Sequence, residues 1–348
     1  MMTRPVGLAI LAAALFGAAT PASKLLLSGL SPFQLAGLLY LGAAIAVAPA
    51  AGRGGGIRLP GRTDQRNRLR LLGAVVAGGI CGPVLFLLGL RLAAAASVSL
   101  WLNFEVAATA LLGVLLFRDH LGLPGWAGVV CTLAGAVLLS LPSGTSGLAA
   151  GGLVLLACLC WGLDNHLTAL IDGITPSQST FWKGLVAGAT NLALGFIFTP
   201  LAVGPLPVLA GLFVGAWAYG ASIVLYISSA QALGATRAQI AFASAPFFGV
   251  VFSVLVLGES LSLVHLGSAL LFIAGVGLLT LDRHAHVHEH EAVVHEHSHR
   301  HDDGHHEHGH PGLPPSAWHT HRHLHEAVVH AHPHWPDLHH RHRHGADS

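Results

Sequence analysis

The feature that most constrains this chain is the near absence of charge from residues 1–281. Charged residues make up 9% of the 348-residue chain, against roughly 25% in an ordinary soluble domain. A soluble body of this size could not cover its surface with so few charges, whereas a polytopic membrane protein needs no such cover. The formal net charge of +1 also argues against a nucleic-acid-binding surface. The acidic residues of this region are Asp64, Glu105, Asp119, Asp164, Asp172 and Glu259.

Ten apolar segments are long enough to cross a bilayer, which takes about 20 mostly apolar residues as a helix. They cover residues 5–27, 33–50, 70–90, 94–117, 124–141, 148–169, 180–199, 206–230, 236–257 and 262–281. The first continues past Pro21 to Lys24, so we interpret it as a transmembrane helix rather than a signal peptide. The sequence therefore predicts an all-α integral membrane protein with ten transmembrane helices in contact with the lipid bilayer.

Basic residues beside the apolar segments indicate the orientation of the chain. The loop between the second and third segments carries Arg53, Arg58, Arg62, Arg66, Arg68 and Arg70. If this loop is cytoplasmic, the opposite side keeps only Lys24 and Arg91, both at the ends of segments. The pattern predicts a multi-pass protein of the plasma membrane with both termini in the cytoplasm.

The chain contains an internal repeat. Residues 113–141 match residues 253–281 without a gap, and Asp119 falls on Glu259. Each half then holds five segments. Because five is odd, the second half must be inverted in the membrane, which is the architecture of many secondary transporters. We expect two inverted five-helix repeats followed by a tail, with boundaries at residues 1–142, 147–282 and 283–348.

The tail from Arg283 onward holds all but three of the 26 histidines of the chain. Neutral imidazole is the commonest protein ligand of transition metals. Alternate residues of an extended chain point the same way, so His-x-His presents two imidazoles together. We therefore expect the tail to bind zinc, nickel or cobalt. The candidate ligands are His286, His288, His290, His295, His297, His299, His323, His325, His330, His332 and His334.

The tail also has a repeat and a composition of its own. A ten-residue unit that starts at His288 recurs from His323, with prolines between the two copies. The prolines and the charge predict a tail that is disordered without a ligand. A second interpretation stays open. On mild acidification the histidines become cationic, and the tail would then bind anionic lipid.

Ionisable side chains inside the bilayer are functional candidates, because each costs roughly 2.5–3.5 kcal/mol at a helix centre. Glu105, Asp164 and Lys183 lie within the fourth, sixth and seventh segments. We expect Glu105 or Asp164 to take up a proton or a cation, and Lys183 to hold an anionic group of the substrate. The alternative is a structural salt bridge between Lys183 and one acid. The candidate substrate pathway comprises Glu105, Asp164, Asn165, Lys183, Asn103 and Asn191.

Other polar residues have structural interpretations. Asp119 and Glu259 lie at segment ends and are expected to cap helices. Lys24 is expected to reach the membrane interface. Cys158, Cys160 and His166 add only a thin set of ligands for a buried metal centre, which takes three or four.

Several short motifs mark the beginnings and the end of the halves. They are Leu15-Phe16-Gly17 with Pro21 and Lys24, Cys160-Trp161-Gly162, Ala243-Ser244-Ala245-Pro246, and the closing GESLSLVHLGSALLFIAGVGLL from Gly258. Through these motifs the region 5–281 resembles the EamA domains of the drug/metabolite transporter superfamily. The resemblance implies ten helices, cytoplasmic termini and transport of small molecules. Phe16 stands where the family usually has Trp, and the histidine-rich tail is not a general family feature.

These features together predict a secondary transporter that works by alternating access and has a metal-binding cytoplasmic tail. Its substrate is expected to be a small metabolite or a metal-related solute, and transport is expected to need no cofactor. The alternative is a membrane-anchored metal buffer or sensor with little transport activity. No Ser-His-Asp arrangement, nucleotide loop or pair of catalytic carboxylates is found, so we do not expect an enzyme. A homodimer is left open.

Overall fold

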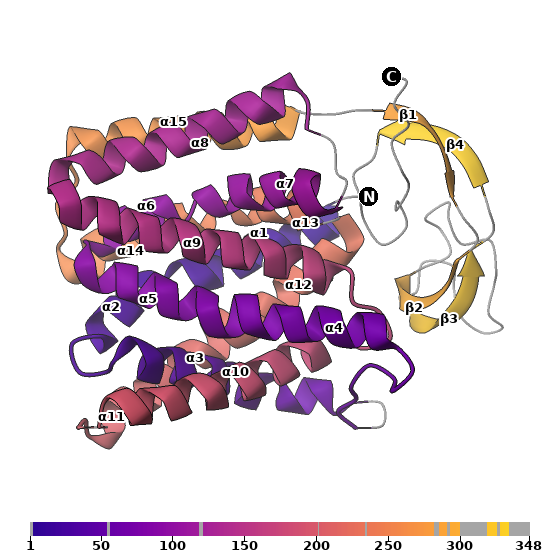
Figure 1. Ribbon diagram of the computed structural model, residues 1–348, viewed down its shortest axis with the longest axis horizontal. Helices are drawn as coiled ribbons and strands as arrows, with labels where there is room; N and C mark the ends of the chain where they lie inside the picture. Colours follow the sequence, from indigo (N-terminus) through magenta and orange to yellow (C-terminus); the bar gives the residue numbers. More distant parts are fainter. Residues whose placement is uncertain are drawn as a thin grey trace.

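The computed structural model describes the helical part of the chain at residues 3–53, 56–117, 121–200, 202–233 and 235–281. Each predicted apolar segment is helical there, as one helix or as consecutive helices (Figure 1). The elements in chain order are α1 (Thr3–Gly17), α2 (Ala19–Leu26), α3 (Pro32–Ala51), α4 (Gln65–Ala74), η1 (Val75–Cys81), α5 (Gly82–Leu92), α6 (Ala95–Trp101), α7 (Phe104–Phe117), α8 (Leu123–Ser140), η2 (Leu141–Ser143), α9 (Gly144–Ala169), α10 (Pro176–Phe198), α11 (Pro205–Val214), η3 (Gly215–Ala221), α12 (Ser222–Leu233), α13 (Ala235–Phe242), α14 (Ala245–Leu257) and α15 (Leu263–Leu281).

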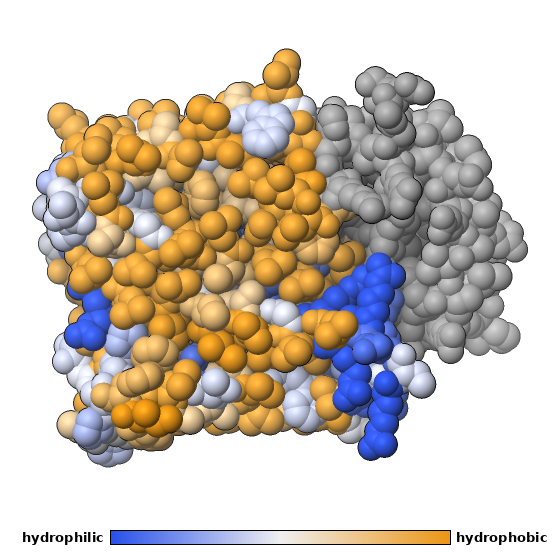
Figure 2. All heavy atoms as spheres, viewed as in Figure 1, coloured by the Kyte–Doolittle hydropathy of each residue, from blue (hydrophilic) through white to orange (hydrophobic). Residues whose placement is uncertain are grey.

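Within the described residues, nine helical stretches are long and apolar enough to cross a membrane. At the tenth predicted segment the structure has a shorter apolar helix, Leu263–Leu279. Apolar side chains cover most of the visible face of the helical part, and hydrophilic side chains gather near its ends, most densely where α4 begins (Figure 2). The chain therefore has the helices and the surface of a multi-pass membrane protein.

Several of the apolar segments are interrupted inside the bundle. Helix α6 ends at Trp101 and α7 begins at Phe104, and the side-chain amide of Asn103 donates to the Leu100 carbonyl at 3.0 Å across this break. Elements η1 and η3 are π-helices, whose i→i+5 bonding interrupts the regular ladder of backbone hydrogen bonds. Interrupted helices bring backbone groups and helix ends into the interior, where membrane transporters build their binding sites.

Helices α3 and α10 form an antiparallel pair that is held at both ends. Each begins with a capping box, which involves Gln34 in α3 and Gln178 in α10. The same glutamines reach across the pair. The Gln34 amide donates to the Thr199 carbonyl at 2.8 Å, and the Gln178 amide donates to the Ala51 carbonyl at 3.2 Å. Close approach along the pair is permitted by small residues of α10, namely Gly184, Gly188 and Gly195.

Glu259 caps a short helix at the end of the bundle opposite the N terminus (Figure 1). Its carboxylate oxygens accept hydrogen bonds from the backbone N–H groups of Ala95 at 2.8 Å and Ala96 at 2.7 Å, in the first turn of α6. A carboxylate at this position satisfies N–H groups that have no partner within the helix. The predicted capping role of Glu259 is confirmed, whereas Asp119 lies outside the described residues.

Lys24 of α2 binds the neighbouring helix end. Its ammonium donates to the backbone carbonyls of Leu90 at 2.7 Å and Ala93 at 2.8 Å, where α5 ends. Lys24 is thus bound to the backbone where α5 ends, and its position relative to the membrane interface stays a prediction. The two contacts together, Lys24 on the end of α5 and Glu259 on the start of α6, are called the Lys24–Glu259 clasp below.

In the C-terminal part the structure describes the backbone of four strands. They are β1 (Ala285–His290), β2 (Val293–His299), β3 (His319–His325) and β4 (Val328–Pro333). Strand β1 pairs antiparallel with β4, and β2 pairs antiparallel with β3. The prediction that the tail is disordered without a ligand stays a prediction. Histidine at alternate positions supplies the period of two that a strand requires.

Candidate functional site

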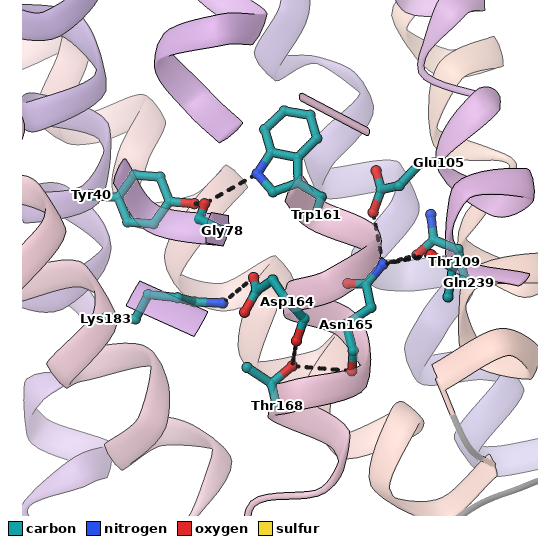
Figure 3. Close-up of polar contacts among 10 residues, drawn as sticks. All are labelled: Tyr40, Gly78, Glu105, Thr109, Trp161, Asp164, Asn165, Thr168, Lys183 and Gln239. Atoms are coloured by element: carbon teal, nitrogen blue, oxygen red, sulfur yellow. Dashed lines mark hydrogen bonds and ion pairs between the residues drawn. The ribbon is translucent and has the colours of Figure 1, made fainter. Parts of the chain in front are cut away.

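Helix α9 carries a row of polar and aromatic side chains into the interior of the bundle (Figure 3). Four residues of α9 follow one another at spacings that bring side chains to one face of a helix, namely Trp161, Asp164, Asn165 and Thr168. All four are buried or nearly so. The Thr168 hydroxyl donates back to the Asp164 carbonyl at 2.8 Å. This face therefore directs one carboxylate and one amide toward the neighbouring helices.

Asp164 forms an ion pair with Lys183 of α10. The Lys183 Nζ atom lies 2.6 Å from Asp164 Oδ2, and the two side chains are only 2% and 9% exposed. Gly78 of η1 packs so closely on the carboxylate that a Cβ at this position would collide with it. The other carboxylate oxygen, Oδ1, is buried without a hydrogen-bond partner. Lys183 is thus committed to Asp164, as in the salt-bridge interpretation of the sequence.

Glu105 lies in the first turn of α7, directly after the break that follows α6. The side-chain amide of Asn165 donates to Glu105 Oε1 at 3.0 Å. The same amide nitrogen is 3.2 Å from Thr109 Oγ1 and 3.3 Å from Gln239 Oε1. Glu105 is buried, and it has no ion-pair partner among the described residues. Its hydrogen-bond partners are therefore neutral.

Aromatic side chains surround these polar groups. Neighbouring ring centroids lie 5.2–5.5 Å apart along the series Tyr40, Tyr219, Phe16, Phe242 and Tyr226. The Trp161 ring adds an edge contact with Phe16, at 6.3 Å between centroids. Such offset and edge-to-face arrangements are the favourable ones for aromatic pairs. The six side chains are called the aromatic wall below.

The aromatic wall, Glu105 and Asp164 line one cavity, called the central cavity here. Its lining comes from both predicted halves, since Glu105 belongs to α7 whereas Asp164 and Lys183 belong to α9 and α10. The hydroxyl groups of Tyr219 and Tyr226 border the cavity without a hydrogen-bond partner.

The π-helix η1 positions part of this lining. Its Gly78 carbonyl accepts hydrogen bonds from the Tyr40 hydroxyl and from Trp161 Nε1, the latter at 3.1 Å. The next carbonyl, that of Gly79, accepts from the Asn191 amide at 3.1 Å. Carbonyls that leave the regular helical ladder are available to side chains in this way. A backbone irregularity thus orients two rings of the aromatic wall.

Comparisons with known proteins agree with this architecture. Residues 3–141 and residues 149–281 each match the EamA-like transporter family. The chain belongs to the EamA-like transporter family. An "uncharacterized transporter" of Methanothermobacter thermautotrophicus is 29% identical over 297 residues, which cover 78% of this chain and 84% of that protein. One crystal structure shares the fold, with a TM-score of 0.54 and 18% identity over 80% of this chain and 96% of its own.

As an EamA-like transporter, the chain is a membrane transporter and not an enzyme. Of the predicted pathway residues, Asn103 and Asn191 lie away from the central cavity. Asn103 bonds across the α6–α7 break, and Asn191 bonds to η1. The structure brings the other four together at the cavity, namely Glu105, Asp164, Asn165 and Lys183.

The sequence prediction missed the tyrosines and Gln239 of this EamA-like transporter. The chain has three tyrosines, and all of them line the central cavity. A signal was available, because a buried tyrosine hydroxyl or glutamine amide is costly without a partner. In an apolar segment such residues are therefore candidates in the same way as charged ones.

His166 and Cys158 take structural roles. His166 Nε2 lies 2.8 Å from the Thr109 carbonyl, and its ring stacks on Phe117. Cys158 is fully buried, with its sulfur 3.9 Å from the Trp101 carbonyl. Within the described helices, no group of three or more His, Cys, Asp or Glu side chains could hold a metal ion.

Proposed function

We propose that this EamA-like transporter is a secondary transporter of a small organic solute, with the central cavity as its binding site. One observation carries the proposal. A single cavity joins an aromatic wall, an ion pair and a carboxyl group that has no ion-pair partner among the described residues. A carboxylate without a cation is costly inside a membrane bundle, so a purely structural role for Glu105 is unfavourable. Glu105 is the group that binds the polar part of the solute.

Related positions in the two halves support transport by alternating access. The π-helices η1 and η3 start at Val75 and Gly215, the same separation as in the sequence repeat. The start of α6 at Ala95 and the start of α13 at Ala235 keep that separation too. We propose that the halves are inverted repeats that rock around the central cavity. The end with the N terminus and the arginine-rich loop would face the cytoplasm of a plasma-membrane protein.

A bare metal ion is a weaker candidate for the cargo. A metal centre takes three or four His, Cys or carboxylate ligands, and no group of three is found within the described helices. Of the two carboxylates at the central cavity, Asp164 already has Lys183 as its partner. The aromatic wall offers no ligands to a metal, but it fits the apolar body of an organic solute.

The Glu105→Gln variant tests this proposal. The purified full chain would be reconstituted in liposomes, and the uptake of labelled amines, amino acids, carboxylates and zinc would be measured. We expect at least one organic solute to move, and Glu105→Gln to slow it by about 10-fold or more. Glutamine keeps the size of the side chain and its contact with Asn165 but removes the charge.

The matched control is Asp64→Asn, which neutralises an acid in a loop far from the cavity lining. Asparagine is as good a helix cap as aspartate, so this variant should transport at the wild-type rate. Zinc flux that depends on Glu105, with no movement of any organic solute, would contradict the proposal. Metal binding without any flux would instead favour a membrane-anchored metal buffer.

We also propose that the tail of this transporter binds zinc, nickel or cobalt. The backbone register supports this role. His286 lies opposite His332, and His288 lies opposite His330. Opposed residues of an antiparallel pair share one face, with Cβ atoms about 5 Å apart, and so do alternate residues along a strand. Four histidine positions therefore share one face, which is the ligand number of a tetrahedral site.

The second strand pair extends the same pattern. At three alternate positions a histidine of β2 lies opposite a histidine of β3, namely at His295–His323, His297–His321 and His299–His319. Metal binding would also fix the register, which is weakly specified in strands that are polar on both faces. Of the predicted ligands, only His334 lies outside the described residues.

Histidines without a histidine opposite them provide a matched control for the tail. His290 lies opposite Val328, and His325 lies opposite Val293. We expect the double variant His288→Ala/His330→Ala to bind fewer zinc ions per chain. The double variant His290→Ala/His325→Ala, which removes histidines of the same faces that have no histidine opposite them, should lose fewer zinc ions than His288→Ala/His330→Ala. Isothermal titration of the full chain with zinc would measure both. An equal loss in the two variants would mean that each His-x-His binds metal by itself.

A further inference from the structure

We infer that the solute of the central cavity is an organic cation, an amine or a quaternary ammonium ion with an apolar body. The inference rests on the proposed function, because it names the class of solute that the cavity binds. It follows from three properties of the described lining residues: their net charge, the state of the lysine, and the aromatic rings beside the free carboxylate.

The charge of the lining favours a cation. Asp164 and Lys183 neutralise each other at 2.6 Å. Glu105 is left with Asn165, Thr109 and Gln239 as neighbours, all of which are neutral. The cavity therefore offers one carboxyl group with no ion-pair partner among the described residues, and ionisation of that group leaves a negative charge in need of a partner. A cationic solute supplies that partner, whereas a neutral solute leaves the buried carboxylate without one.

The state of Lys183 argues against an anionic solute. The sequence interpretation gave Lys183 the role of binding an anionic group, but its ammonium is held by Asp164. To bind an anion, Lys183 would have to leave a carboxylate that is closely packed against Gly78 and already has one unpaired oxygen. Breaking a buried ion pair leaves an uncompensated charge and is strongly unfavourable.

The aromatic wall supplies the rest of a cation site. Phe16 and Phe242 line the central cavity together with Glu105 and Gln239, and the same four residues border a small neighbouring pocket. The two phenylalanines thus lie beside the free carboxylate. Ring faces attract a desolvated ammonium group and its alkyl substituents. The unpaired hydroxyl groups of Tyr219 and Tyr226 can accept hydrogen bonds from an N–H of the solute.

Three probes that share a phenylethyl body and differ in charge would test the inference. They are phenethyltrimethylammonium, 3-phenylpropionamide and 3-phenylpropionate. Binding to the purified full chain in detergent would be measured by isothermal titration. We expect the cation to bind about 10-fold or more tightly than the neutral amide. The anion should bind most weakly. A preference for the anion, or equal affinity for all three, would overturn the inference.

Variants identify the groups that select the cation. Glu105→Gln should remove the preference for the cation and bring the ratio of cation affinity to amide affinity to within about 2-fold of unity. Phe242→Leu keeps the apolar volume but removes a ring face, so it should lower the ratio of cation affinity to amide affinity by about 5-fold. Asp64→Asn should change neither affinity. Retention of the cation preference in Glu105→Gln would overturn the inference.

The same measurements separate this inference from the proposed function. If the anion or the amide binds best and Glu105→Gln still stops its transport in liposomes, the cavity remains the transport site and only the cationic class is wrong. If no probe binds and no solute of the wider panel moves, both the inference and the proposed function fail. Circular dichroism of each purified variant would show that it is folded.

Discussion

Lys183→Met is expected to lower the free energy of unfolding by about 3–5 kcal/mol, because it leaves Asp164 as a buried charge without a partner. Methionine fills a similar volume but donates no hydrogen bond. The cost should be high at this site, since Asp164 Oδ1 already lacks a partner and both side chains are almost fully buried. Unfolding of the purified protein in detergent, followed by circular dichroism against temperature or denaturant, would measure the loss.

A second substitution isolates the charge from the packing. In Lys183→Met/Asp164→Asn the buried group is neutral, and an unpaired amide costs less than an unpaired carboxylate. The double variant should therefore recover most of the lost stability. A Lys183→Met protein as stable as the wild type would show that the ion pair does not stabilise the contact between α9 and α10.

Gly78→Ala is expected to destabilise the protein by about 1–3 kcal/mol, the usual cost of overpacking, and to impair transport. The new methyl group would collide with the Asp164 carboxylate. It would also displace the Gly78 carbonyl, to which Tyr40 and Trp161 donate. One added methyl group thus disturbs the ion pair and two rings of the aromatic wall together. Unfolding and liposome uptake would be measured on the same preparation.

Gly152→Ala is the matched control for Gly78→Ala. Gly152 lies within α9, and a Cβ there would meet no atom within 4 Å. Alanine is favoured over glycine in a helix interior by roughly 0.5–1 kcal/mol, so this variant should be slightly more stable and should transport normally. If both variants lose the same stability, close packing on Asp164 is not the cause of the effect at Gly78.

The sequence revealed the positions of the helices and of the charged members of the site for a single physical reason. Residues that are costly in an apolar surrounding are rare there, so Glu105, Asp164 and Lys183 could be recognised without any structure. The apolar segments themselves follow from the length that a helix needs to cross a bilayer. Both inferences depend on local composition, which the chain shows directly.

Other parts of the site depend on contacts between distant segments. Whether an asparagine reaches the cavity or bonds to a backbone carbonyl is decided by packing, and Asn191 and Asn165 have opposite outcomes. Packing between distant segments also decides that Lys183 pairs with Asp164 rather than with Glu105. The π-helices leave no clear mark in the sequence. The strands of the tail were missed because its prolines and charge outweighed the alternating histidines.

The Lys24–Glu259 clasp has a consequence for how its surroundings tolerate substitution. Both charged side chains bind backbone groups, at Leu90 and Ala93 on one helix end and at Ala95 and Ala96 on the next. Every residue other than proline offers the same N–H and carbonyl groups, so the contacts themselves do not depend on the side chains at these four positions. Leu90, Ala95 and Ala96 are fully buried, so packing rather than the clasp limits substitution there. The side-chain contacts that join these helix ends therefore depend on the identity of only two residues, Lys24 and Glu259.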